Sequence, residues 1–214
     1  MRHDSERVPG KNYRSFNGRP LYHWIVSTLL ESGRVDEVLI DTDSPWIVED
    51  AARFDGVRTI ARPEHLLGGE TPMNAVLLHD VAQADADWYL QTHSTNPLLR
   101  PATVAAAVDT MLASADAYDS LFSVTALQTR LYWPGGQAIN HDPAVLLRTQ
   151  DLPPVYEENS CLYLFRRDTI ERTGSRIGER PNLFAVDAEE ATDIDVELDF
   201  RLAEVLGRLR EQTA

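Results

Sequence analysis

Short apolar runs alternate with helix-like stretches through the first two-thirds of the chain, and this alternation constrains the fold more than any other feature. Proline opens three of the helical stretches, at Pro20, Pro45 and Pro72, where its missing N–H is not needed. The runs VDEVLID, VRTIAR, DWYLQTH and SLFSVTAL lie between helical stretches and are typical of strands. Strands that alternate with helices predict an α/β fold, with a mainly parallel sheet covered by helices on both faces.

The alternation breaks between Gln128 and Asn159, in a stretch rich in proline and glycine. This stretch is too long for an ordinary connection, so we interpret residues 128–159 as an insertion within a single domain spanning residues 1–214. The strand pattern resumes at SCLYLFRR and NLFAVD. The last segment predicts an amphipathic helix whose apolar face carries Leu198, Leu202, Val205, Leu206 and Leu209.

The composition argues against several classes of partner. A net charge of −14 would repel a phosphate backbone, so we expect no nucleic-acid partner. The polar N-terminus does not resemble a signal peptide, and no apolar run approaches the length of a membrane span. The single cysteine, Cys161, excludes an internal disulfide. We therefore expect no membrane partner and a cytoplasmic location.

The opening sequence MRHDSERVPGKN is the densest basic stretch of this acidic chain. Arg2, Arg7 and Lys11 can supply charge-assisted donors to an anion, and Gly10 allows the backbone to approach a phosphate closely. The stretch matches neither the Walker A pattern nor G-x-G-x-x-G. It predicts a phosphate-binding loop of another kind or, on charge alone, a solvated basic tail.

Two aspartates near the C-terminus form a second candidate site, within the sequence ATDIDVELD. In an extended segment, Asp193 and Asp195 point to the same side, because side chains repeat with a period of two. Two adjacent carboxylates favour a hard divalent cation, and Mg²⁺ commonly binds one or two carboxylates together with substrate phosphates. Alternatively, Asp195 caps the helix that follows.

A polar cluster follows the strand DWYLQTH, and in open α/β sheets ligands bind beyond the carboxyl ends of the strands. Gln91, His93 and Ser94 in this cluster can hydrogen-bond a polyhydroxylated ligand. His93 could act as a general base, but no Ser/His/Asp spacing accompanies it, and a lone loop histidine is more often a bystander. A capped turn leading into the helix at Pro101 would also explain the cluster.

Taken together, these stretches resemble the acylneuraminate cytidylyltransferase family, which comprises the CMP-sialic acid synthetases and their CMP-Kdo synthetase relatives. The family's loop A-R-x-x-S-K/E-R-x-P-x-K-N is matched at Arg2, Ser5, Arg7, Pro9, Lys11 and Asn12. Further matches follow in order along the chain, at NGRPLYHWIV, VLIDTDS, ARPEHLLGGETP, LQTHSTNPLLRP and TDIDVELDF. No single match is decisive, but the ordered set is specific.

The resemblance implies a Rossmann-like nucleotidyltransferase fold and transfer of CMP from CTP to the anomeric hydroxyl of a nonulosonic sugar acid, with release of pyrophosphate. It implies that the catalytic residues are Arg2, Lys11 and Asp195. The nucleotide-binding residues would be Arg2, Ser5, Lys11, Asn12, Arg62 and Asn74. The residues that bind the sugar acid would be Gln91, His93, Ser94 and Tyr156. Asp193 and Asp195 would bind Mg²⁺, and residues 128–159 would form a homodimer.

Three features depart from the family pattern. QTHSTNPLL carries an extra residue and lacks the family's P-T-S-P, and YEENSCLYLF replaces an N-G-A-I-Y-like stretch, which leaves another acceptor open: Kdo, another sugar or a phosphonate. The family's first strand has no counterpart ahead of Met1, so we expect the natural chain to carry a further central strand there. A non-catalytic nucleotide-binding module with a site disabled by the lost strand is a third hypothesis.

Overall fold

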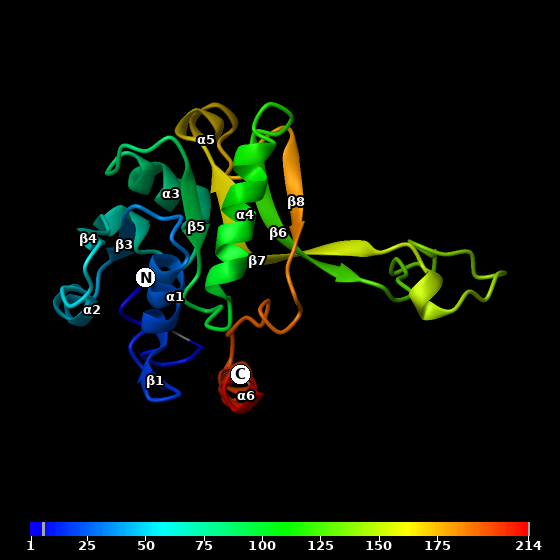
Figure 1. Ribbon diagram of the computed structural model, residues 1–214, viewed down its shortest axis with the longest axis horizontal. Helices are drawn as coiled ribbons and strands as arrows, with labels where there is room; N and C mark the ends of the chain where they lie inside the picture. The colour runs from blue at the N-terminus through cyan, green and yellow to red at the C-terminus, as the bar shows by residue number, and fades with distance from the viewer. Residues whose placement is uncertain (6, 214) are drawn as a thin grey trace.

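The computed structural model describes residues 1–5 and 7–213, and it has the α/β architecture expected from the sequence. Strands form the middle of the body, helices cover both faces, and a long arm leaves the body on one side (Figure 1). The helices are α1 (Leu21–Glu31), α2 (Pro45–Ala51), α3 (Met73–Val81), α4 (Pro101–Ala113), α5 (Arg167–Thr173) and α6 (Glu197–Thr213), with 3-10 turns η1 (Glu64–Leu66) and η2 (Thr149–Asp151). The strands are β1 (Ser15–Phe16), β2 (Arg19–Pro20), β3 (Val38–Thr42), β4 (Val57–Ala61), β5 (Tyr89–Thr92), β6 (Ser120–Leu127), β7 (Val155–Phe165) and β8 (Pro181–Ala185).

The described strands form three separate sheets. β1 and β2 pair antiparallel, and β3 and β4 pair in parallel. The third sheet has the order β5-β7-β6-β8, in which β7 is antiparallel to β5 and β6 while β8 is parallel to β6. The arrangement is therefore mixed rather than mainly parallel, because β6 and β7 are joined as a long hairpin and hairpin strands must run antiparallel.

Strand β7 separates two layers of helices by simple alternation of its side chains. Leu162 and Leu164 belong to a large core cluster with α1 and α4, whereas Tyr163 and Phe165 pack with α3 and α5 on the other face. All four side chains are almost fully buried. Burying an apolar side chain of this size contributes about 1.5–3 kcal/mol, so the period of two in this strand fixes both helical layers in place.

Each of the four prolines expected at a helix start lies at the first helical residue or at the N-cap just before it. The Ser44 hydroxyl accepts a hydrogen bond from the Ile47 N–H at 3.4 Å, with Pro45 in the first turn of α2. Helix α4 likewise begins at Pro101. In α1 and α3, the proline holds the N-cap position instead, at Pro20 and Pro72.

The C-terminal helix α6 buries a different face from the one expected. Phe200 and Ala203 pack with Phe16 and Leu21 in a second core cluster. Most of the apolar face predicted from the sequence is exposed instead, at Leu198, Leu202, Val205 and Leu209. The helix itself was predicted correctly. The buried face was not, because the spacing of apolar residues does not say which face packs against the rest of the protein.

Residues 128–154 form an arm that projects from the β6–β7 hairpin (Figure 1). The expected insertion extended to Asn159, but β7 already begins at Val155 and pairs there with Leu127. The arm exposes large apolar side chains, and Leu146 is 89% exposed. Within the part of the chain that the structure describes, no helix combines the length and apolar character needed to cross a membrane.

A cleft of about 900 Å³ lies between β3 and β5. No described strand pairs with the edges of β3 and β5 that line it, because β3 pairs with β4 and β5 with β7. Its inner wall is apolar and includes Ile40 of β3 and Leu90 of β5. Polar and charged side chains lie at the end where these strands finish. The further central strand expected from the sequence resemblance stays a prediction.

We expect six alternating Val and Ile residues fused ahead of Met1 to insert between β3 and β5 and to raise the melting temperature by about 5–15 °C. The physical reason is that the segment would pair two open strand edges and fill an apolar cavity. Thermal unfolding followed by circular dichroism measures the change. A Gly/Ser extension of the same length is the matched control, and an equal shift from both extensions would contradict the prediction.

Candidate functional site

The basic loop near the N-terminus and the twin aspartates near the C-terminus meet in the folded chain. The Lys11 ammonium donates a hydrogen bond to the backbone carbonyl of Ile194 at 2.7 Å. Arg7 forms an ion pair with Asp195 at 2.8 Å. Val8 and Ile194, which are fully buried in the same cluster, hold the two segments together. The sequence prediction that these distant segments share one site agrees with this geometry.

Local geometry shapes the basic loop. The Lys11 N–H donates to the Val8 carbonyl at 3.1 Å, which closes a tight turn through Pro9 and Gly10. Gly10 has a φ of +64°, and a Cβ at this position would lie 2.8 Å from the Tyr13 ring. Only glycine fits both constraints without strain. The loop therefore has a defined conformation and is not a solvated tail.

The segment 192–194 is also tied to the polar cluster beyond β5. The Ile194 N–H donates to the Thr95 carbonyl at 2.9 Å, and the buried Asn96 amide donates to the Thr192 carbonyl at 3.4 Å. The Ser94 hydroxyl donates to the Asn12 side chain at 2.7 Å. Three segments that are remote in the sequence thus converge at the carboxyl end of β5.

The side chains of residues 193–195 alternate in burial. Asp193 and Asp195 are exposed and Ile194 between them is buried, which is the alternation expected of an extended segment. Desolvation, and then the Asp195 carboxylate, raise the pKa of Asp193, whereas Thr95 and Lys11 favour its ionised form. Asp195 does not cap α6, because the Asp199 carboxylate accepts the N–H groups of Asp195 and Val196 at 3.0 and 2.8 Å. The geometry thus disfavours the capping alternative for Asp195.

The two aspartates fit the modest demands of Mg²⁺. Among the described residues, no group of three or more His, Cys, Asp and Glu side chains could hold a metal on its own. Mg²⁺ keeps several waters and needs only one or two carboxylates when substrate phosphates complete its shell. The like-charge repulsion recorded at Asp193 is what a divalent cation would relieve.

Burial lowers the pKa of Lys11, while the Asp193 and Asp195 carboxylates favour its protonated form. The Lys11 ammonium thus lines the cleft and is also close enough to the Asp193 and Asp195 carboxylates to interact with their charges. Arg2 and Ser5 line the same cleft, and the Arg2 carbonyl accepts a hydrogen bond from the Asn12 amide at 2.9 Å. These groups form a polar rim suited to an anionic ligand.

Gln91, His93 and Ser94 also line the cleft, beyond the end of β5, and Ser94 adjoins the basic loop through Asn12. The side chains of Gln91 and His93 hydrogen-bond at 2.7 Å. Burial, and then the Arg176 charge, lower the pKa of His93 to about 4. A lowered pKa favours the neutral imidazole, which can take part in hydrogen bonds and is a weaker general base than an ordinary histidine.

Arg62 lies at the end of β4, where its guanidinium pairs with Asp41 at 3.0 Å and both side chains are largely buried. Asp80 of α3 lies beside this pair. Burial, and then the neighbouring Asp41 carboxylate, raise the pKa of Asp80 to about 7. Arg62 reaches the cleft, as expected, but part of its donor capacity is already used by Asp41.

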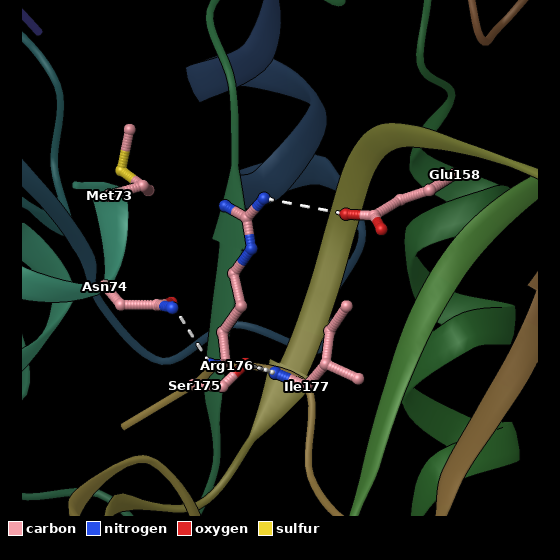
Figure 2. A pocket seen from close by; sticks show the side chains of 6 residues that line it. All are labelled: Met73, Asn74, Glu158, Ser175, Arg176 and Ile177. Carbon is pink, nitrogen blue, oxygen red and sulfur yellow. Dashed lines mark hydrogen bonds and ion pairs between the residues drawn. The ribbon is translucent and has the colours of Figure 1, made fainter. Parts of the chain in front are cut away.

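Two of the residues expected at the site lie elsewhere. Asn74 of α3 lines a smaller neighbouring cavity of about 210 Å³, where its side-chain oxygen accepts a hydrogen bond from the backbone N–H of Arg176 at 3.2 Å (Figure 2). Tyr156 is 50% exposed near the start of β7 and lines neither cavity. The resemblance placed Tyr156 at the acceptor site. In the structure it lies in the second position of β7, beside the base of the arm.

Three side chains that shape this region were not among the residues expected from the sequence: Arg176, Asp80 and Asp199. Arg176 and Asp80 belong to no recognised motif. Arg176 meets α3 and β5 from the α5–β8 connection, and Asp80 of α3 meets Asp41 of β3. Asp199 could have been found, because an acidic residue in the first turn is a common signal of a helix N-terminus.

A parallel β-pair, a mixed sheet between helices and a cleft with polar and charged side chains at the strand ends are features of the Rossmann-like nucleotidyltransferase fold. A solved structure of CMP:2-keto-3-deoxy-manno-octonic acid synthetase complexed with CTP supports this class, with a TM-score of 0.70 over 99% of this chain and 96% of that chain, at 18% identity. The chain belongs to the cytidylyltransferase family, whose model matches residues 1–212. The family resemblance seen in the motifs, and with it the class of CTP-dependent nucleotidyltransferase, is thereby confirmed.

Curated relatives cover nearly all of this chain. Post-translational flagellin modification protein B of Campylobacter coli is 24% identical over 214 residues, which covers 94% of this chain and 90% of that protein. N-acylneuraminate cytidylyltransferase A of Danio rerio is 26% identical over 208 residues, which covers 94% of this chain and 47% of that protein. The chain thus spans about half the length of the Danio rerio relative.

We expect Asp80→Asn to reduce the pH dependence of stability. Because the folded pKa of Asp80 is raised from its ordinary value to about 7, the folded state keeps a proton that the unfolded state has released. The free energy of unfolding should therefore fall as pH rises from 5 to 8, and Asp80→Asn should remove roughly 1–3 kcal/mol of that fall. Urea unfolding at both pH values measures it.

The exposed Asp116 provides a matched control, because it lies on the surface outside both cavities. Asp116→Asn should leave the pH dependence of unfolding unchanged. If Asp80→Asn and Asp116→Asn behave alike, Asp80 is not the group that loses stability as pH rises.

Proposed function

We propose that this chain transfers CMP from CTP to the anomeric hydroxyl of a nonulosonic or related 3-deoxy-2-keto sugar acid and releases pyrophosphate. The observation that carries the proposal is the meeting of Lys11 and Arg7 with the segment that bears Asp193 and Asp195. A triphosphate with a bound divalent cation needs cationic donors for its phosphates and carboxylates for the cation, and this meeting brings both kinds of group to the strand ends.

Transfer of a nucleotidyl group depends chiefly on positioning and on neutralising charge. Arg2 and Lys11 would bind the phosphates, and Ser5 and Asn12 would orient the nucleotide with Arg62. Asp193 and Asp195 would hold Mg²⁺, which supplies further positive charge at the triphosphate when bound. Gln91, His93 and Ser94, beyond the end of β5, would hydrogen-bond the sugar acid, with its hydroxyl turned towards the basic loop.

The acceptor class follows from the relatives and from the polar wall. The Danio rerio relative is named for N-acylneuraminate, and the similar solved structure is named for 2-keto-3-deoxy-manno-octonic acid. Both are sugar acids rich in hydroxyl groups, which the amide, imidazole and hydroxyl of Gln91, His93 and Ser94 suit. We also propose a cytoplasmic location, supported by the buried free thiol of Cys161.

A pyrophosphate-release assay with CTP, Mg²⁺ and a panel of sugar acids tests the proposal directly. We expect turnover with at least one acid, and we expect Asp195→Asn to lower kcat/KM by about 100-fold or more, because it removes a metal-binding charge. Asp195 is exposed, so the fold should survive the change. CTP binding without pyrophosphate release from any acceptor would instead favour a non-catalytic nucleotide-binding module.

The exposed Asp187, which follows β8, is the control for this substitution. Asp187→Asn should leave turnover unchanged. If Asp195→Asn also leaves it unchanged, Asp195 does not belong to the metal site.

We propose that two copies of the chain associate through the arm of residues 128–154. Support comes from the large apolar side chains that the arm exposes to solvent, Tyr132, Trp133, Val145 and Leu146 among them. An exposed apolar surface of this kind is typical of a protein–protein interface.

We expect Leu146→Glu to convert the dimer to a monomer, because it places a charge in the apolar surface of the arm. Sedimentation velocity measures the mass. Leu202→Glu, on the exposed face of α6, serves as the comparison and should leave the dimer intact. Dissociation by Leu202→Glu alone would move the interface to α6.

A further inference from the structure

Arg176 lies in the connection between α5 and β8, and its side chain extends along β5 into the smaller cavity (Figure 2). Met73 lies on one side of its guanidinium and Glu158 of β7 on the other (Figure 2). The side chain is only 15% exposed. Burying a cation this far is costly unless neighbouring groups compensate for its charge.

The described partners of the Arg176 guanidinium are few. It donates a hydrogen bond to the Gln91 side-chain oxygen at 2.6 Å, stacks 3.5 Å from the centre of the Tyr163 ring, and lies 3.8 Å from the Glu158 carboxylate. The Glu158 carboxylate also accepts a hydrogen bond from the Tyr163 hydroxyl. A guanidinium has five N–H donors, so these contacts leave donors over for a ligand.

Arg176 is connected to the proposed acceptor wall through hydrogen bonds. Gln91 accepts from Arg176 through its oxygen and meets His93 through its nitrogen at 2.7 Å. The next residue, Ser94, donates to Asn12 of the basic loop at 2.7 Å. A row of polar side chains therefore runs from Arg176 to the loop proposed to bind phosphate.

We propose that Arg176 binds the carboxylate of the sugar-acid acceptor and thereby selects acids over neutral sugars. In a 2-keto sugar acid the carboxylate and the reacting hydroxyl are attached to the same carbon. A guanidinium that holds the carboxylate in a bidentate contact also turns the hydroxyl in a fixed direction. Gln91 holds the guanidinium and the Tyr163 ring supports its face. This inference rests on the function proposed above and adds the residue that recognises the acid.

Glu158 opposes a ligand carboxylate, because it places a negative charge beside Arg176. The proposal therefore predicts opposite effects for two neighbouring substitutions. Arg176→Met should weaken acid binding, whereas Glu158→Gln should strengthen it and still leave an oxygen for the Tyr163 hydroxyl. A purely structural role for Arg176 would not reverse sign in this way.

Calorimetric titration of the intact protein with N-acetylneuraminic acid, Kdo and the methyl ester of each acid tests the proposal in the absence of divalent cations. Wild type should bind at least one acid more tightly than its ester. Arg176→Met should weaken binding of that acid by about 10- to 150-fold and remove the preference over the ester. Arg176→Lys should restore part of it, and Glu158→Gln should tighten acid binding by about two- to fivefold.

Arg172→Met is the matched control, because Arg172 lies on the exposed surface of α5 and pairs with Glu179 outside the cavity. It should bind both acids as wild type does. Equal weakening of acid and ester by Arg176→Met, wild-type binding by Arg176→Met, or no binding of either acid to wild type would each overturn the inference.

The assay for pyrophosphate release separates this inference from the proposed function. If wild type binds an acid through Arg176 but releases no pyrophosphate with any acid, the proposed function fails and the carboxylate site stands. If wild type releases pyrophosphate and Arg176→Met keeps the KM for the acid, the inference about Arg176 fails and the proposed function stands.

Discussion

The hydrogen bond from Lys11 to the carbonyl of Ile194 joins the two ends of the chain, and the candidate site depends on this junction. Charged groups alone would not hold it, because the Arg7–Asp195 pair is exposed and such pairs contribute little. The buried side chains of Val8 and Ile194 supply the stable part of the contact. Apolar burial thus positions the basic loop, and the charges set what this position can bind.

The polar wall beyond β5 completes the same junction. The backbone of Ile194 pairs with Thr95, and Ser94 contacts Asn12. A change in the basic loop would therefore also move the polar side chains beyond β5. The low pKa of His93 and the raised pKa of Asp193 have a common first cause in desolvation. An enclosed cleft with nearby fixed charges is the environment in which phosphate groups are bound without covalent chemistry.

Much of the fold could be predicted from the sequence, because its signals are local. The helix that begins at Ser44-Pro45 and the alternation in SCLYLFRR depend on residues a few positions apart. The basic loop and the Asp193–Asp195 pair were found because each is a compact motif. The positions of Asn74 and Tyr156 could not be inferred, since each depends on which element lies beside it: the α5–β8 connection for Asn74 and β6 for Tyr156.

The order of helices and strands, the acidic balance of the chain and the motifs of a cytidylyltransferase were determined by the sequence alone, because they need only local spacing and composition. The antiparallel course of β7, the exposed face of α6 and the approach of Arg176 to Gln91 were decided by tertiary structure. These features join residues that lie far apart along the chain. Whether such residues meet depends on how whole helices and strands pack, and local spacing in the sequence does not specify that packing.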